Sequence, residues 1–219
     1  MTNIVKKVWK TIDNSPCIQR NMYRGLINSR ALAKYIIKEK KIDATIDAVI
    51  SAIRRYELNQ YEELFTTAQN MIIQTVNLST RSQLAGISLI KDTDTQKILP
   101  KLFNIIQYVR GDVLRIIQAN ESIKILIDEK NMENVLDLFS KDKIVTIDKE
   151  LAEINMHIHP KMQITLGVLA TITNELTING INIVDAITCS PEMLWFVKEE
   201  DLLKAYNVLY QLCKSNKTM

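Results

Sequence analysis

The chain has 219 residues, which is enough for two or three small domains with cores of their own. It has no apolar run long enough to cross a bilayer, and its first residues lack a signal-peptide pattern, so we expect a cytoplasmic protein with no membrane partner. Its three cysteines are scattered without metal-ligand spacing, which fits a reducing compartment and predicts no metal site.

The charge is divided unevenly along the chain. Residues 1–56 hold 12 Lys and Arg against 4 Asp and Glu, whereas the remainder holds 16 against 21. The first part therefore carries +8 and the rest −5, although the net charge is only +3. A basic segment of this kind predicts contact with a polyanion.

Residues 1–58 are expected to form a basic domain of four short helices. The first covers residues 2–12, the second begins at Ser15-Pro16, and Asn28 caps the third. After a short connection at 40–43, the fourth covers 44–58. The side chains expected to face inward are Ile4, Val5, Val8, Trp9 and Ile12 of the first helix, Ala31, Leu32, Tyr35 and Ile36 of the third, and Ile46, Val49, Ile50 and Ile53 of the fourth.

This order resembles a helix-turn-helix domain, in which residues 43–56 would be the recognition helix. The N-terminal half of this helix, which should face the base edges, offers Thr45, Asp47 and Ser51 but no Arg, Lys, Asn or Gln. We therefore expect little sequence-specific recognition of bases. Phosphate contacts are expected instead. The candidate nucleic-acid-binding residues are Arg20, Arg24, Arg30, Lys34, Lys38, Lys40, Lys41, Arg54 and Arg55.

Three partners of the basic domain stay open. The domain could bind DNA, or it could bind ribosomal RNA or a ribosomal subunit. The pattern also fits a domain that binds no nucleic acid, whose basic face is solvated or docks a protein. Reversing the charge of both Arg54 and Arg55 to Glu is expected to abolish polyanion binding while leaving a dimer intact.

Residues 59–69 are expected to be a helical connector, because they contain no Gly or Pro. Residues 70–145 then predict a first small module. Strands are expected at 86–90 and 122–127, with an apolar helix running through 102–109 and a closing helix over 131–139.

Residues 146–215 predict a second module, followed by a tail at 216–219. Gly167 is placed in the turn that opens a helix, and Gly180 is expected to close that helix at positive φ. A strand is expected over 181–184.

The second module then continues past a turn at Pro191 to another strand at 195–197, and Asp201 is expected to cap the last helix. Gly111 and Gly180, which lie 69 residues apart in similar surroundings, indicate that one module is repeated.

The stretch from Ile164 to Leu212 resembles the second half of aspartokinase and other amino-acid-sensing regulators, that is, an ACT domain. The resemblance implies an α+β fold, in which the helix-turn-helix-like domain is followed by tandem ACT-like modules of ferredoxin-like βαββαβ topology. It also implies a homodimer formed through these modules, because such domains are usually dimerisation units that respond to small molecules.

The whole layout is similar to an archaeal family described as regulators of amino-acid metabolism. The segments that resemble this family's first domain are 24–33 (RGLINSRALA) and 50–56 (ISAIRRY).

By the same resemblance, an amino-acid effector would lie at the interface of two ACT modules. It would be held by the loop before the first helix and by the start of the second strand across the interface. The free N–H groups at the start of that helix would attract the carboxylate of the amino acid. The residues so implied are Thr165, Leu166, Gly167 and Val168 in the loop, with Asn182, Ile183 and Val184 across the interface. Leu166 stands where Pro usually precedes the Gly, and the first module has Lys91 to Asp94 without a Gly, so one site per chain is expected at most.

No catalytic residues are predicted. The sequence has no P-loop, no dinucleotide fingerprint and no convincing acid–base pair, so we expect no cofactor beyond the effector. His157 and His159 are expected on one strand face, too few to bind a metal. Three functions remain: a transcriptional regulator of amino-acid metabolism, a translation-associated factor on the ribosome, or the regulatory subunit of a biosynthetic enzyme.

Overall fold

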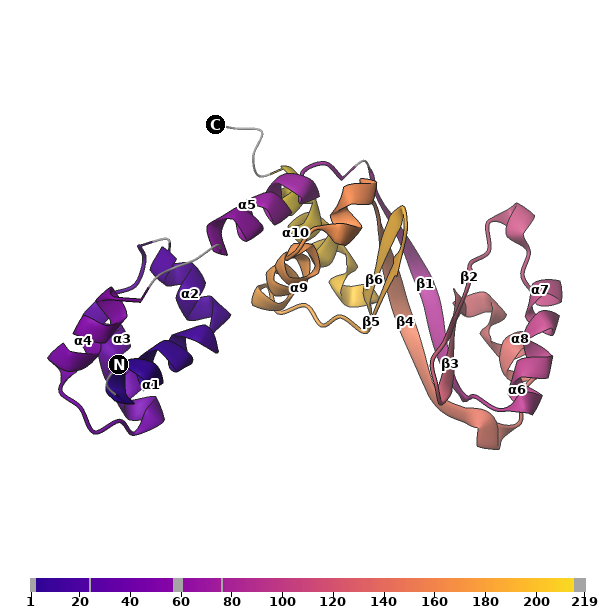
Figure 1. Ribbon diagram of the computed structural model, residues 1–219. Helices are drawn as coiled ribbons and strands as arrows, with labels where there is room; N and C mark the ends of the chain where they lie inside the picture. Colours follow the sequence, from indigo (N-terminus) through magenta and orange to yellow (C-terminus); the bar gives the residue numbers. More distant parts are fainter. Residues whose placement is uncertain (1–2, 24, 57–60, 76, 215–219) are drawn as a thin grey trace. The chain divides into compact units, whose positions relative to one another are not determined.

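The computed structural model describes residues 3–23, 25–56, 61–75 and 77–214 (Figure 1). It contains two compact units, residues 1–67 and 68–219. The helix expected in the connector is present as α5 (Tyr61–Ile72), and residues 57–60 lie outside the described parts.

The first unit contains α1 (Asn3–Asp13), α2 (Pro16–Tyr23), α3 (Ser29–Lys40) and α4 (Ile46–Arg54). The cap at Asn28 is confirmed, because its side-chain oxygen accepts hydrogen bonds from the N–H groups of Arg30 and Ala31 at 2.9 and 3.1 Å. The core is formed by Val5, Val8, Ile12, Leu32, Ala33, Ile36, Ile42, Val49, Ala52 and Ile53.

Two inward positions were predicted wrongly in α3. Ala31 is exposed and Tyr35 is 52% exposed, whereas Ala33 is buried in their place. The apolar stripe is shifted from the predicted one, because Leu32, Ala33 and Ile36 are buried in the core and Ile37 packs partly against it.

The second unit is built on one antiparallel sheet with the strand order β2-β3-β1-β4-β6-β5. Its two central strands, β1 (Asn77–Ile90) and β4 (Ile144–His157), have 14 residues each. The outer strands are β2 (Leu114–Gln118), β3 (Ser122–Asp128), β5 (Asp185–Cys189) and β6 (Glu192–Lys198).

The long strands β1 and β4 each take part in both halves of the sheet. The first half of β1, Asn77 to Arg81, pairs with the end of β4, whereas Leu84 to Ile90 pairs with β3 and with the start of β4. Between these segments the register shifts, and Gln83 and Glu150 adopt positive φ values of 57° and 55°. The domain boundary predicted between residues 145 and 146 therefore falls inside β4.

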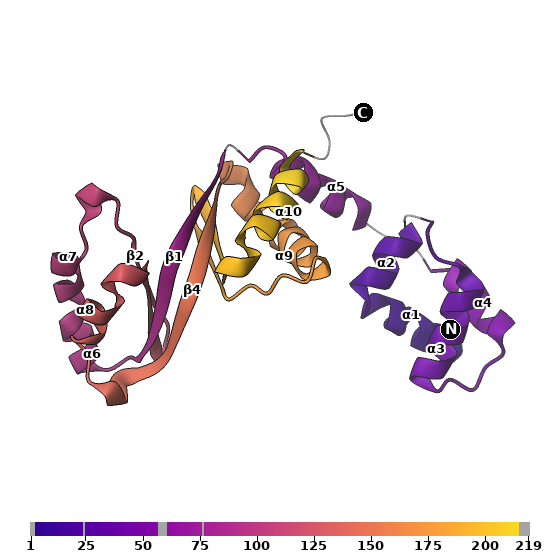
Figure 2. The same ribbon diagram turned by 180° about the vertical axis from the view of Figure 1, so that it is seen from behind.

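Short helices cover the outer side of each half (Figures 1 and 2). One half carries α6 (Thr93–Ile98), α7 (Leu102–Ile105) and α8 (Met132–Leu136). The other carries α9 (Val168–Ile178) and α10 (Leu202–Lys214). The intervening 3₁₀ turns are Leu99–Lys101, Tyr108–Arg110, Glu129–Asn131, Lys141–Lys143, Pro160–Ile164 and Glu199–Asp201.

Each helical layer buries its own apolar core, and a third core lies on the opposite face of the strands. This inner core contains Leu84, Val113, Leu126, Leu151, Leu194 and Phe196. Arg115 on β2 bonds to Glu153 on β4, and Lys124 on β3 pairs with Asp185 on β5. In a flat sheet these strands would lie about 14 and 19 Å apart. The sheet is therefore curved, so that its two halves face each other across the inner core.

Several sequence predictions are confirmed in this unit. The strands expected at 86–90, 122–127 and 195–197 lie within β1, β3 and β6. Gly167 opens α9 at φ 85°, and Gly180 follows that helix at φ 70°.

The strand predicted over 181–184 is wrong, because β5 begins only at Asp185. Ile181 is buried and its N–H bonds back to the carbonyl of Leu176, which keeps this segment attached to the end of α9.

The helix predicted through 102–109 is also wrong. It ends at Ile105 because the side chain of Asp112 accepts the N–H of Gln107 at 3.1 Å, and Val109 is fully exposed. His159 does not share a strand face with His157, since β4 ends at His157 and His159 caps the next 3₁₀ turn.

Candidate effector site

The start of α9 is a helix N-terminus that no side chain caps. Gly167 occupies the N-cap position in the left-handed conformation. The first hydrogen bond of the turn joins the N–H of Thr171 to the carbonyl of Gly167 at 2.8 Å. The N–H groups of Val168, Leu169 and Ala170 therefore have no partner within the helix, and they carry the positive end of its dipole.

These same residues line a hollow of about 610 Å³. Its size is within the range usual for small-molecule sites. Its walls are mainly apolar, and Leu166 and Leu169 are 68% and 48% exposed at its edge. The lining residues are Met162, Gln163, Thr165, Leu166, Gly167, Val168, Leu169, Ala170, Thr188 and Met193.

The structure brings together four of the seven predicted effector residues. Thr165, Leu166, Gly167 and Val168 all line the hollow, whereas Asn182, Ile183 and Val184 do not. The latter three follow the far end of α9 and lead into β5, and Val184 donates its N–H to the carbonyl of Phe196 at 2.8 Å. One chain by itself does not join the two groups.

The corresponding helix start in the other half is already occupied by the protein. Asp92 caps α6, because its Oδ1 accepts the N–H of Thr95 at 2.8 Å and its other oxygen pairs with Lys143. The hydrogen bond from Lys143 and that from Thr95 lower the pKa of Asp92 well below its usual value. A carboxylate of the chain thus holds the position that is open at α9.

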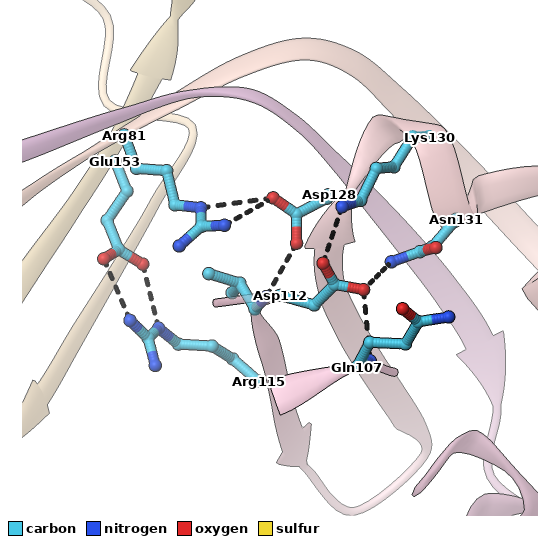
Figure 3. Close-up of polar contacts among 9 residues, drawn as sticks. Arg81, Gln107, Asp112, Arg115, Asp128, Lys130, Asn131 and Glu153 are labelled. Atoms are coloured by element: carbon cyan, nitrogen blue, oxygen red, sulfur yellow. Dashed lines mark hydrogen bonds and ion pairs between the residues drawn. The ribbon is translucent and has the colours of Figure 1, made fainter. Parts of the chain in front are cut away.

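Charged side chains also lie on the inner face of the sheet, between its two halves (Figure 3). Arg115 donates two hydrogen bonds to Glu153 at 2.8 and 2.9 Å, which raise the pKa of Arg115. Arg81 donates two to Asp128 at 3.1 and 2.8 Å, and Asp128 also accepts the N–H of Val113 at 2.6 Å.

Asp112 is held in a similar way at the edge of this face (Figure 3). It accepts hydrogen bonds from Lys130, Asn131 and the N–H of Gln107 at 2.6, 2.9 and 3.1 Å. Lys130, then Asn131, lower the pKa of Asp112 to about 2. These carboxylates are already paired with side chains and N–H groups of the protein, so they connect parts of the fold. Sequence reasoning missed them because partners 15 to 47 residues apart give no local pattern.

The basic residues of the first unit are mostly on its surface. Arg30, Lys34, Lys38, Lys40, Lys41, Arg54 and Arg55 are exposed, and Arg20 is half-buried. Arg24 lies outside the described residues. On the predicted recognition helix, the hydroxyl of Thr45 accepts the N–H of Ala48 at 3.3 Å, so this group caps α4.

Neither a metal-binding cluster nor a membrane-spanning helix is present within residues 3–23, 25–56, 61–75 and 77–214. No cluster of three or more His, Cys, Asp and Glu side chains is placed to hold a metal ion in those ranges. No helix within them combines the length and the apolar character needed to cross a membrane.

The second unit has the fold of the ACT-type regulatory region of aspartokinase. Residues covering 65% of this chain match aspartate kinase from Clostridium acetobutylicum, at 14% identity and a TM-score of 0.53. The regulatory subunit of aspartate kinase from Thermus thermophilus matches 64% of the chain at 17% identity, with a TM-score of 0.50. The regulatory subunit from Thermus flavus matches 64% at 16% identity, with a TM-score of 0.51.

The chain spans different shares of these proteins. It covers 35% of the Clostridium enzyme but 97% and 98% of the two Thermus regulatory subunits. No protein-family model and no curated protein sequence matches the chain.

Proposed function

We propose that this chain is a non-enzymatic regulatory protein of amino-acid metabolism, acting in the cytoplasm as a homodimer that binds an amino-acid effector. One observation carries the proposal: within an ACT-type fold, the N-terminus of α9 is uncapped and opens into a hollow. The tandem modules would be ferredoxin-like units that share β1 and β4.

The chemistry of the hollow matches a free amino acid. Its carboxylate would accept hydrogen bonds from the N–H groups of Val168 to Ala170, as anions do at helix starts. Its side chain would lie against Leu166, Leu169 and Met193. The 182–184 loop of a second copy would close the site, which would make binding depend on dimerisation.

Thermal unfolding of the full chain with each common amino acid tests the effector. A ligand at 100 times its Kd stabilises a protein by about 2.7 kcal/mol, which gives a readily measured shift. We expect at least one amino acid to raise the Tm. If none does at millimolar concentration, the sensing role is contradicted.

Gly167→Asp is the matching variant, with Gly180→Asp as its control. Both glycines have positive φ, so both substitutions strain the backbone in the same way. Only Gly167→Asp puts a carboxylate at the start of α9. That carboxylate would cap the helix, as Asp92 caps α6, and so would compete with the carboxylate of the effector. The effector should raise the Tm of the Gly180 variant but not that of the Gly167 variant. A shift retained in both would place the ligand elsewhere.

We further propose that the basic helical unit, helix-turn-helix-like in layout, binds nucleic acid, so that effector binding regulates a dimer on DNA. To do so, the effector must bind two arrangements of the dimer with different affinity. Binding to ribosomal RNA or a ribosomal subunit is the second candidate, because α4 exposes Thr45, Asp47 and Ser51 and little base-reading chemistry.

A third candidate is a regulatory subunit of a biosynthetic enzyme. It is supported by the Thermus neighbours, which are themselves regulatory subunits of aspartate kinase. Purification of the tagged chain from native extract at low and high salt separates the three. Promoter DNA near amino-acid genes would favour the transcriptional regulator. Ribosomal RNA that is lost at high salt would favour the ribosome-binding factor, and one co-purifying enzyme would favour the regulatory subunit.

A further inference from the structure

We propose that α3, and not α4, is the helix by which this protein contacts nucleic acid, through the phosphates of its backbone. The contact residues are Arg30, Lys34, Lys38 and Lys41, which we call the α3 ladder. This inference rests on the nucleic-acid binding proposed above and assigns it to one face of one helix.

The spacing of the ladder aligns its cations along one side of α3. Arg30, Lys34 and Lys38 follow one another at intervals of four, so at about 100° per residue they lie within an arc of roughly 80°, and each rises by about 6 Å along the axis. Lys41 is the residue directly after the helix, where the backbone turns into the left-handed conformation at φ 45°. All four are exposed, whereas Leu32, Ala33 and Ile36 of the same helix are buried in the core. The ladder is therefore a straight basic strip on the outer side of α3.

The ladder is not neutralised within the part of the chain that the structure describes. Glu39 is the one acidic residue of α3, and its carboxylate lies 3.9 Å from Lys40, which is not a ladder member. Among the described residues, no acidic side chain is paired with a ladder cation. Like charges four residues apart repel one another, although Lys38, in the last turn, also gains from the helix dipole. The strip is suited to a polyanion that supplies the missing negative charge.

The exposed face of α4 is less suited to this contact. Asp47 lies in its first turn, where it repels a phosphate, and the Thr45 hydroxyl is used in capping. Arg54 and Arg55 come only at its end, where the Nε of Arg55 donates to the carbonyl of Ser51 at 3.1 Å. The positive charge of the unit is thus continuous on α3 and interrupted on α4.

Salt dependence of binding separates the two helices. Affinity falls with salt at a slope of about 0.9 per phosphate contact on duplex DNA and about 0.7 on a single strand. Lys34→Gln with Lys38→Gln removes two ladder charges, and Arg54→Gln with Arg55→Gln removes two from α4. Lys, Arg and Gln have similar helix propensity, so both double variants should fold. Circular dichroism and thermal unfolding of each full-length variant check this.

The measurement is the affinity of the full chain for duplex DNA, duplex RNA and single-stranded RNA over a range of salt concentrations. The α3 double variant should lower the slope by about 1.8 on a duplex and by about 1.4 on a single strand. In contrast to the sequence-based expectation that Arg54 and Arg55 are essential for polyanion binding, the α4 double variant should keep the slope of the unaltered protein. The probe with the steepest slope identifies which nucleic acid supplies the phosphates.

Two outcomes would overturn the inference in different ways. If the unaltered protein binds the probes but the α3 variant keeps its slope, or the α4 variant alone loses slope, the contact is not on α3. If the unaltered protein binds none of the probes, nucleic-acid binding itself is refuted and the ladder is a solvated face.

Discussion

Replacing Arg115 by Met should destabilise the second unit by about 3 kcal/mol, because it leaves the carboxylate of Glu153 buried without its partner. Glu153 is only 4% exposed, and Arg115 donates to both of its oxygens, at 2.8 and 2.9 Å. Removing one member of a buried ion pair typically costs about 3–5 kcal/mol. We expect the lower end, since the Arg115 side chain is 30% exposed and water can enter beside it.

A double-mutant cycle tests the reasoning behind this value. Replacing Arg115 by Met and Glu153 by Leu together removes both charges, so the double variant should be within about 1 kcal/mol of the unaltered chain. Chemical unfolding would be followed by the fluorescence of Trp195 in a Trp9→Phe background. The two tryptophans of the chain lie in different units, so this signal reports the second unit alone. Additive losses in the cycle would refute a buried, coupled pair.

Three further changes test other contacts. Gly86→Ala should destabilise the second unit by about 1–2 kcal/mol in urea unfolding. A Cβ at this position would lie 2.9 Å from Cε of Lys124, whose amine is fixed by two carboxylates. An unchanged urea midpoint would contradict this. Asp92→Ala should lower the urea midpoint because it removes the cap of α6. Asp94→Ala, in the same turn but exposed and not capping, should lower it much less, and equal losses would exclude capping. The pKa of Asp112 is lowered from 3.8 to about 2, so its stabilising contribution is present above pH 4 and is lost as the pH falls toward 2. Asp112→Asn should therefore flatten the acid limb of the stability curve, and an unchanged limb would show that the pKa is not lowered.

The sequence predicted those elements whose signals are local. Asn28 caps α3 through its own side chain, and Gly167 opens α9, because each acts on the residues that follow directly. The strand at 195–197 was found because both faces of β6 are buried, which gives a continuous apolar run.

The failures lie where distant contacts override local preference. Ile181 and Ile183 have strand propensity, but Ile181 is buried at the end of α9, which delays β5 to Asp185. Val109 fits a helical stripe, yet the carboxylate of Asp112 ends the helical run earlier by bonding the N–H of Gln107. The pairing of Arg115 with Glu153 depends on the curvature of the whole sheet, for which no short segment gives a signal.

The two halves of the sheet show how one arrangement can carry different chemistry. Each half has a helix that follows a long central strand, and the two helix starts have the same exposed N–H groups. At α6 these are satisfied by Asp92, which is itself neutralised by Lys143, so an added anion would have to displace a carboxylate already held in place. At α9 the residue in the capping position is Gly167, which has no side chain to offer. If the chain binds an anionic effector as proposed, one helix start is open to it and the other is closed, which predicts at most one effector per chain.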